Sequence, residues 1–308
     1  MADNDGLYDV VIIGAGPAGL TAGMYCARQG LATAIVGGEV GGQAAWAGEI
    51  ENYMGWQMVT GKELVSAFRE HVSAFDVTCF EGELVNAIVP ASDGYEVYTR
   101  EGTRLPARAV LIATGRAPNR LAVPGEQEFV GRGVSYCATC DAAFFKGKPV
   151  AVVGPGESAA DAALQLADLG ASVTIITQRP LKAPEGVLER VDAHDKVMVR
   201  EGVKVTSIVG GDRVTGVVVR PLKGESEDTI PVEGVFIETG SIPVAEFTGG
   251  LVETNDRGEI IVGKDNATNA PGIWAAGDVT DGPGKQIIIA AGEGARAAIA
   301  INRYLKRR

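Results

Sequence analysis

The sequence has few imidazole and thiol ligands for a metal ion: it holds 2 histidines and 4 cysteines among 308 residues. Cys137 and Cys140 form a CxxC pair, whereas Cys26 and Cys79 stand alone. A structural zinc ion needs four ligands, and the sequence offers neither a second cysteine pair nor histidines at ligand spacing to complete the set. We therefore expect no metal site, and the cysteine pair needs another explanation.

Positive charge is also scarce, with 28 lysines and arginines against 39 aspartates and glutamates and a net charge of -11. This balance repels the phosphates of nucleic acids and anionic membrane surfaces, so neither is an expected partner. No uncharged apolar run is long enough to cross a membrane, and the N-terminus lacks a basic stretch followed by an apolar one. The sequence predicts a soluble cytoplasmic protein.

Glycine, by contrast, is abundant at 42 residues, while aromatic residues make up only 6% of the chain. Glycines set between short runs of Val, Ile and Ala are typical of α/β folds, which need tight turns and close approaches of the backbone to ligands. The length is that of a two-domain globular protein.

The first glycine loop, 14–19, follows the apolar run 8–13 and precedes a helical pattern. In this strand, turn and helix order, Gly14 permits the tight turn, Gly16 lets the backbone approach a pyrophosphate, and Gly19 lets helix and strand pack. The N-terminus of the helix would face the phosphates. This context predicts dinucleotide binding.

Glu39 follows a second apolar run, 32–36, closely enough to reach a ribose hydroxyl. A carboxylate at this position favours an unphosphorylated ribose, which fits FAD. Farther on, the pattern predicts a helix at 61–73 and strands at 77–89, 95–100 and 109–113.

The two lone cysteines are interpreted as structural. Cys26 lies within the first predicted helix and is most simply a small buried hydrophobe. Cys79 lies in the predicted strand 77–89, where we expect a packed thiol rather than a reactive one.

Cys137 and Cys140 are followed at once by Asp141, and the three predict a redox-active disulfide. Two intervening residues can hold the sulfurs close enough to bridge, and so short a loop gains little entropic stabilisation. Such a pair suits redox cycling better than stapling. Asp141 can give and take the proton that thiol–disulfide exchange requires. A purely structural disulfide is the alternative, although nothing else in the chain resembles a secreted protein.

A second glycine loop, 154–159, follows the apolar strand 149–153 and precedes a helix that ends near 169. It predicts a second nucleotide-binding fold, with Ala159 in the third small position. The candidate NAD(P)H contacts are Gly154, Gly156, Ser158, Ala159 and Arg179. The alternative is that this domain keeps its fold without binding a nucleotide.

The end of the chain looks like a return to the first domain. A strand at 273–278 ends in Gly277 and Asp278, and an alanine-rich helix follows at 286–304. The N-terminal end of that helix could stabilise negative charge on a reduced flavin. Between the second glycine loop and this point, strands are predicted at 173–177, 204–209, 214–220 and 235–237.

Taken together, these motifs resemble those of the low-molecular-weight thioredoxin reductases, in the same order and over essentially the whole chain. The resemblance rests on 14–19, 41–43, 51–52, 113–115, 137–141, the second glycine loop and 275–278. It implies a homodimer of α/β chains with two Rossmann-like (doubly wound) domains, the second inserted into the first. Residues 1–117 and 245–308 would bind FAD. Residues 118–244 would carry the disulfide, normally bind NADPH, and rotate to present the disulfide alternately to the flavin and to thioredoxin.

The resemblance also implies roles for individual residues. Cys140 would face the flavin, Cys137 would attack the protein disulfide, and Asp141 would serve as their acid and base. The FAD contacts carried over are Gly14, Gly16, Pro17, Ala18, Gly19, Glu39, Gly42, Gln43, Asn52, Ala113, Thr114, Gly115, Gly277, Asp278, Lys285, Gln286 and Ile287.

Two departures from the family pattern concern the electron donor and the last helix. The family grips the NADPH phosphate with a His-Arg-Arg cluster and a further arginine, where this chain has Thr177, Gln178 and Arg179, with Lys182 nearby. The family's Arg-Gln before the last helix is Lys285 and Gln286. We therefore expect a donor other than NADPH, such as ferredoxin or another reduced carrier. The alternatives are an ordinary NADPH-dependent thioredoxin reductase, a dithiol oxidase, and a redox sensor that does not turn over.

Overall fold

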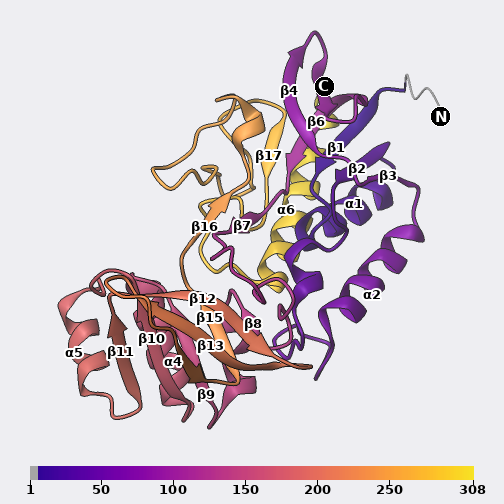
Figure 1. Ribbon diagram of the computed structural model, residues 1–308. Helices are drawn as coiled ribbons and strands as arrows, with labels where there is room; N and C mark the ends of the chain where they lie inside the picture. The colour runs from indigo at the N-terminus through magenta and orange to yellow at the C-terminus, as the bar shows by residue number, and fades with distance from the viewer. Residues whose placement is uncertain (1–5) are drawn as a thin grey trace. The chain divides into compact units, whose positions relative to one another are not determined.

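The computed structural model describes residues 6–308, which form two compact α/β units (Figure 1). The first unit contains the described residues up to Trp46, then Glu51–Ala117 and Ile242–Arg308. The second contains Ala47–Ile50 and Pro118–Ser241. The chain passes between the units through β7 (Arg116–Pro118) and β16 (Ser241–Pro243), which pair as a two-stranded ribbon. The predicted mixed α/β fold is confirmed.

The first unit is built on a seven-stranded sheet. Its parallel strands, in spatial order, are β3 (Val77–Glu81), β2 (Thr33–Gly37), β1 (Tyr8–Ile13), β6 (Arg104–Ile112) and β17 (Ile273–Ala275). The hairpin of β4 (Val85–Ala91) and β5 (Gly94–Thr99) joins the first half of β6 in antiparallel fashion. The single strand expected at 77–89 is therefore two strands. The extended conformation is interrupted at Gly82, whose φ of 82° is in the left-handed region.

The helices of the first unit begin with recognisable signals. The helix α1 (Pro17–Arg28) has Gly16 at its N-cap and Pro17 in its first turn. The helix α2 (Gly61–Ser73) starts with a capping box, in which the Thr60 hydroxyl accepts the Glu63 N–H while the Glu63 carboxylate accepts the Thr60 N–H. The long helix α6 (Ile287–Leu305) ends the chain. A short 3-10 helix, η1 (Gly42–Trp46), follows β2.

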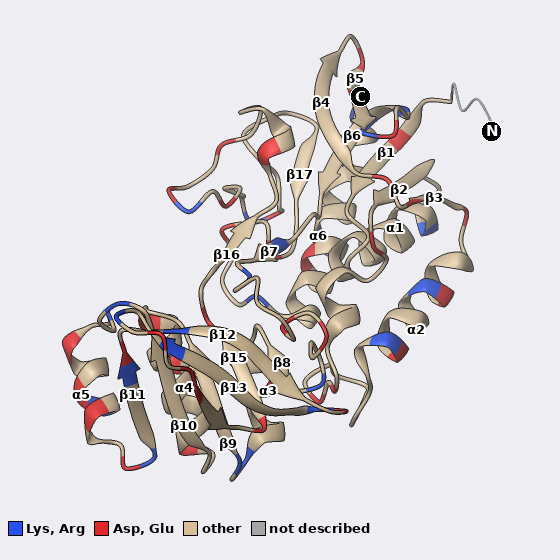
Figure 2. Cartoon of the chain, viewed as in Figure 1, with Lys and Arg blue, Asp and Glu red and all other residues tan. Residues whose placement is uncertain are grey.

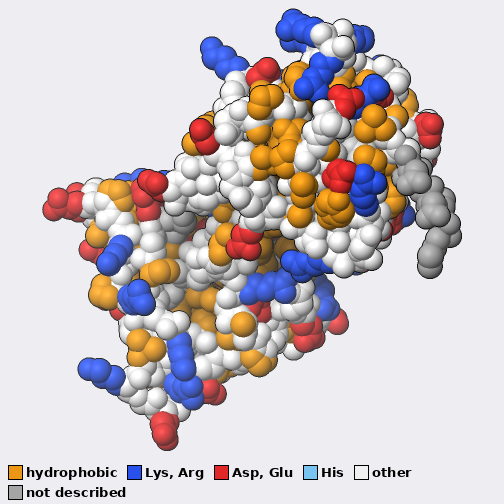
Figure 3. Space-filling view, turned by 90° about the horizontal axis from the view of Figure 1, so that it is seen from above, with side chains coloured by type: hydrophobic (Ala, Val, Ile, Leu, Met, Phe, Trp, Pro, Cys, Tyr) orange, Lys and Arg blue, Asp and Glu red, His pale blue; other side chains and the backbone are white. Residues whose placement is uncertain are grey.

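Charge is spread over the surface. Figure 2 marks residues of both signs along α2. Figure 3 shows Lys, Arg, Asp and Glu in small groups on the face seen from above, with hydrophobic side chains between them. Within residues 6–308, no helix is both long and apolar enough to cross a bilayer.

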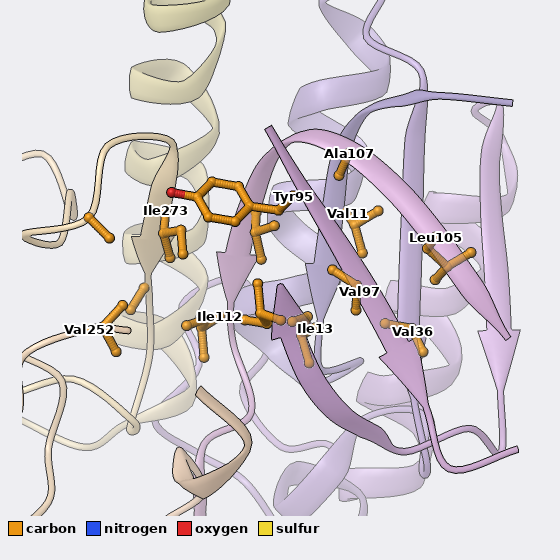
Figure 4. Close-up of a cluster of buried hydrophobic side chains, with 14 of the residues drawn as sticks. Val11, Ile13, Val36, Tyr95, Val97, Leu105, Ala107, Ile112, Val252 and Ile273 are labelled. Atoms are coloured by element: carbon orange, nitrogen blue, oxygen red, sulfur yellow. The ribbon is translucent and has the colours of Figure 1, made fainter. Parts of the chain in front are cut away.

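Side chains of the first sheet alternate between two hydrophobic clusters, one on each face. Val11 and Ile13 of β1 point into one cluster, which Figure 4 shows with Val97 and Ile273. Val10 and Ile12 point into the other, where α1 and α6 cover the sheet. Because both faces are covered, β1 is apolar without alternation from Val10 to Ile13.

The second unit has a parallel five-stranded sheet. Its strands, in spatial order, are β11 (Val197–Glu201), β10 (Ser172–Thr177), β9 (Pro149–Val153), β15 (Gly234–Ile237) and β8 (Val134–Ser135). An antiparallel sheet of β12 (Val203–Gly210), β13 (Val214–Pro221) and β14 (Asp228–Pro231) accompanies it. The helices are α3 (Ala138–Asp141), α4 (Glu157–Asp168) and α5 (Glu185–Ala193), with short 3-10 turns at η2 (Ala142–Phe145) and, in the first unit, η3 (Glu246–Thr248).

We predict that replacing Gly294 of α6 by a residue with a side chain destabilises the protein. A Cβ at this position would lie 2.1 Å from the backbone oxygen of Ala18, so Gly294→Ala must push α6 away from α1. We expect a loss of roughly 1–3 kcal/mol of stability. Gly292→Ala on the same helix is the control, because a Cβ there meets no atom within 4 Å. It should be neutral or stabilising by up to about 1 kcal/mol. Thermal unfolding of both variants tests this, and equal melting temperatures would refute it.

Candidate functional site

In the first glycine loop, the tight turn, the close packing and the open backbone lie at the glycines where the sequence predicts them. Gly14 has a φ of 112°, and a Cβ there would lie 2.2 Å from the oxygen of Ala113. A Cβ at Gly19 would lie 1.8 Å from the oxygen of Gly14. At Gly16, by contrast, a Cβ would meet no atom within 4 Å, so the backbone at the N-terminus of α1 is open to a ligand.

Other predicted cofactor residues gather around this loop. The Gly41 N–H donates to the oxygen of Ala15 at 2.7 Å, which brings Gly42 beside Gly16. The Gln43 amide donates to the oxygen of Arg116 at 2.5 Å. The segment 113–115 arrives at the end of β6, next to the loop, where the Thr114 hydroxyl donates to Val244. The carboxyl ends of parallel strands meet here, as in dinucleotide-binding folds.

Glu39 lies two residues beyond β2 and is exposed. Its carboxylate accepts the indole N–H of Trp46, with distances of 3.2 and 3.1 Å to its two oxygens. This bond fixes the carboxylate near the first glycine loop while leaving acceptor capacity for a ribose hydroxyl. The sequence analysis missed Trp46, although its place at the end of η1, seven residues after Glu39, is within reach of a local contact.

Gly277 and Asp278 follow β17 and complete this edge of the sheet. The Gly277 N–H donates to the Glu293 carboxylate at 2.7 Å, and both groups are buried. Burial raises the pKa of Asp278, whereas Lys285 and Arg116 pull it down. Glu293 was not predicted, and its one signal is that it is an acid on the otherwise apolar inner face of α6.

The residues before α6 make contacts of two kinds. The Asn52 amide donates to the Gln286 side chain at 3.1 Å, so two predicted residues 234 positions apart in the sequence lie together. Ile287 is the first residue of α6. The Lys285 ammonium instead donates to the oxygens of Thr280 and Gly282, at 2.6 and 2.8 Å. These bonds hold the ammonium within the loop 280–285, so it is not directed at a ligand.

The cysteine pair lies in the second unit, and the predicted disulfide is present. Cys137 and Cys140 are bonded, with a Cα–Cα distance of 5.3 Å. Cys137 is the N-cap of α3, and its sulfur accepts the Cys140 N–H at 3.2 Å. Ser135, at the end of β8, accepts the Cys137 N–H at 3.0 Å. Within residues 6–308 no group of three or more His, Cys, Asp or Glu side chains is arranged to hold a metal ion.

Two carboxyl groups accompany the disulfide. Burial raises the pKa of Asp141, and Glu49 adds to this, while a bond from Ser135 opposes it. Burial also raises the pKa of Glu238 to about 7, opposed by its bond from the Ala138 N–H, which is 3.3 Å from Glu238 Oε1. Both groups can therefore carry a proton closer to neutral pH than ordinary carboxyls can. Glu238 was not predicted, because it comes 100 residues after Ala138 in the sequence.

The second glycine loop repeats part of the geometry of the first. A Cβ at Gly154 would lie 2.3 Å from the oxygen of Glu238, whereas a Cβ at Gly156 would meet no atom within 4 Å. Gly156 is the N-cap of α4. Ser158 is exposed on the first turn of that helix and Ala159 is buried, as a third small position requires.

The end of β10, where a 2'-phosphate would be recognised, carries mixed charge. Arg179 is exposed, and its backbone is fixed by the Thr177 hydroxyl, which donates to the Arg179 oxygen at 2.7 Å. Glu201 at the end of β11 pairs in register with Thr177, and its carboxylate accepts the Leu181 N–H at 2.9 Å. The carboxylate of Glu201 therefore contacts the backbone two residues after Arg179, the one arginine of this loop.

The two lone cysteines differ from each other. Cys26 is buried within α1, as predicted, and burial raises its pKa to about 12. Cys79 is exposed, so the expectation of a packed thiol was wrong. It lies on β3, the edge strand of the first sheet, where the side chains are only partly covered.

Comparison with known proteins agrees with this geometry. The family described as pyridine nucleotide-disulphide oxidoreductase matches residues 8–294. A relative from Pseudomonas putida, a component of alkyl hydroperoxide reductase, is 40% identical over 304 residues. That match covers 97% of this chain but only 58% of the relative, so the chain spans less than two thirds of that protein's length.

Two solved thioredoxin reductases are similar to this chain over nearly their whole length. The structure from Streptococcus pyogenes MGAS5005 has a TM-score of 0.93 and 37% identity, covering 98% of this chain and 99% of that one. The structure from Giardia duodenalis has a TM-score of 0.89 and 30% identity, covering 97% and 99%.

We predict that iodoacetamide sorts the four cysteines of the native protein into three classes. Without reductant, Cys79 should be labelled, slowly because partial burial and Glu81 raise its pKa, and Cys26 should be protected. After mild reduction, Cys137 and Cys140 should be labelled as well. Mass spectrometry of peptides reads the sites, and denatured protein, labelled at every thiol, is the control. Labelling of Cys26 in the native state would contradict this account.

Proposed function

The chain belongs to the pyridine nucleotide-disulphide oxidoreductase family, and on that premise we propose that it is a thioredoxin-reductase-like enzyme. It would pass electrons from FAD through the disulfide of Cys137 and Cys140 to a protein disulfide of the thioredoxin type. The observation that carries the proposal is this disulfide at the N-cap of α3, with the half-buried carboxyl of Asp141 beside it. A redox sensor that does not turn over would need neither the acid nor the full set of cofactor loops.

Membership of the family implies FAD binding, and the first unit fits FAD. The open backbone at Gly16 would hold the pyrophosphate at the N-terminus of α1, and Glu39 would hold a ribose hydroxyl. Gly277, which Glu293 fixes, and Asp278 would contact the rest of the cofactor. When bound, FAD supplies the two electrons that open the disulfide.

The cysteines and Asp141 then carry the exchange. Two electrons and two protons convert the disulfide into two thiols. Asp141 takes the proton of the Cys137 thiol, the resulting thiolate attacks a sulfur of the substrate disulfide to form a mixed disulfide, and the leaving thiolate takes that proton from Asp141. Asp141 next takes the proton of Cys140, whose sulfur attacks the Cys137 sulfur, and the second substrate thiolate takes this proton from Asp141 as it leaves. The Cys137–Cys140 bond is thereby restored, and the substrate has been reduced.

For the electron donor we propose a carrier other than NADPH, with a ferredoxin-type protein as the first candidate. A 2'-phosphate needs local positive charge, and the loop after β10 offers Arg179 and Lys182 beside the carboxylate of Glu201. In the family this place holds more arginines. The second candidate is a pyridine nucleotide, which the family match and the open Gly156 favour.

The proposal has three further parts. The first unit would be the FAD domain and the second the disulfide and NAD(P)H-type domain, close to the limits expected at 117 and 245. The chain would act as a homodimer, which light scattering of the purified protein can test. It would act in the cytoplasm, where thiols are kept reduced and a disulfide is usually transient and catalytic.

We predict that Cys137→Ser removes disulfide turnover but leaves FAD bound, because the variant loses the attacking thiol and none of the cofactor loops. The assay is reduction of thioredoxin with chemically reduced enzyme, with bound FAD measured by absorbance. Cys79→Ser is the matched control and should turn over normally. Full activity in Cys137→Ser would show that the cysteine pair is structural.

We predict that NADPH reduces the bound flavin poorly. A good charge-assisted contact is worth about 1.5–3 kcal/mol, so two missing arginines cost on the order of 3–5 kcal/mol. That is a few hundred- to several thousand-fold in affinity. Anaerobic titration with NADPH, NADH and reduced ferredoxin, followed by flavin absorbance, compares the three donors. Rapid stoichiometric bleaching by micromolar NADPH would overturn the prediction and favour an ordinary NADPH-dependent reductase.

A further inference from the structure

Glu238 occupies an unusual position in the second unit. It directly follows β15, whose four residues are all buried, and its own side chain is half-buried. Its backbone N–H donates to the oxygen of Val153 at 2.8 Å, so it lies at the carboxyl edge of the parallel sheet. Figure 1 shows β15 beside β9, the strand that leads into the second glycine loop.

The side chain of Glu238 reaches the disulfide turn. Its Oε1 accepts the N–H of Ala138, the residue between Cys137 and the rest of α3. The N–H groups at this turn are also the donors that would stabilise a Cys137 thiolate, as the bond from the Cys140 N–H to the Cys137 sulfur shows. The Glu238 carboxylate accepts a different N–H of the same turn, that of Ala138, and brings its negative charge to this turn.

Within residues 6–308, no lysine, arginine or histidine forms an ion pair with Glu238, so its charge is not neutralised by a direct partner. Asp141 on α3 is the titratable side chain next to the disulfide turn that Glu238 contacts. No charged side chain contributes to the raised pKa of Glu238, whose causes are burial and, opposing it, the bond from the Ala138 N–H.

We propose that Glu238 is a positioning residue of the disulfide centre: it holds the first turn of α3 through Ala138, and its charge sets how readily Cys137 and Cys140 form a thiolate. The proposal rests on the redox role proposed for these cysteines. Protonated Glu238 permits the thiolate, and ionised Glu238 opposes it. The same residue contacts the second glycine loop through its backbone, since a Cβ at Gly154 would lie 2.3 Å from the Glu238 oxygen.

The direction of the effect with pH follows from the pKa of Glu238, which burial raises to about 7. Below that value the side chain is mostly neutral and the thiols feel no added charge. Above it the side chain is ionised, and a nearby negative charge raises the pKa of the thiols. Reduced wild-type protein should therefore be less reactive above pH 7 than an isolated dithiol turn would be.

The test is the rate at which iodoacetamide labels Cys137 and Cys140 in the fully reduced protein, measured across pH by mass spectrometry. Glu238→Gln keeps an oxygen for Ala138 but removes the charge. It should react about 3- to 10-fold faster than wild type above pH 7, because one pKa unit is a tenfold change in ionisation. The two should converge below about pH 6, where a group of pKa near 7 is neutral. Glu238→Ala, which also loses the bond, should not converge.

Two controls keep the result specific. Cys79 lies in the other unit and is an internal reference whose rate should not change, and Glu227→Gln removes an exposed acid of the second unit. If Glu238→Gln and wild type coincide at every pH, the charge has no role and the proposal fails. If the variant does not fold, the wild-type profile decides: the labelling rate should depart near pH 7 from the titration of the two thiols alone, and a profile that the two thiols describe fully would overturn the proposal. Labelling needs neither donor nor protein substrate, so failure here leaves the proposed function intact.

Discussion

Hydrogen bonds across the carboxyl edge of the first parallel sheet hold the candidate cofactor site together. The Gly14 N–H donates to Val36, the Ala113 N–H to Ile13 and the Ala276 N–H to Ile112, at 2.7, 2.7 and 2.9 Å. Each bond extends the ladder of the sheet by one residue into a loop. The loops therefore inherit the register of the strands, and residues from widely separated parts of the chain arrive at one edge. Glycine is required where these loops touch, since any side chain at Gly14 or Gly19 would strike backbone.

The second sheet uses the same arrangement for a different purpose. The Gly154 N–H donates to Ile176 and the Glu238 N–H to Val153, at 3.1 and 2.8 Å. This edge carries an open glycine loop, and it also carries a disulfide turn that the side chain of Glu238 joins to the sheet. One unit thus combines a nucleotide-type loop with the thiol chemistry, while the other holds the loops suited to a flavin.

Local patterns could be predicted from the sequence, and long-range pairs could not. The helix at Gly61–Ser73 was correct at both ends because its apolar positions repeat with the helical period, and both glycine loops were recognised from their spacing. The strand expected at 77–89 failed because the pattern does not show that Gly82 turns the chain. Partners such as Glu293 for Gly277 depend on packing between elements, which no local pattern encodes. The helix α5 and the strand β11 were missed, since both are short and only weakly apolar.

The loop closed by Lys285 bears on how this position can change in related sequences. A compact ammonium satisfies two carbonyl oxygens, of Thr280 and Gly282, from a single point. A guanidinium presents its donors in a rigid plane and would approach these two oxygens with a different geometry. Lysine and arginine are therefore not interchangeable here. Among homologues, a change of the residue at 285 should therefore accompany a change in the length or glycine content of the segment 280–284.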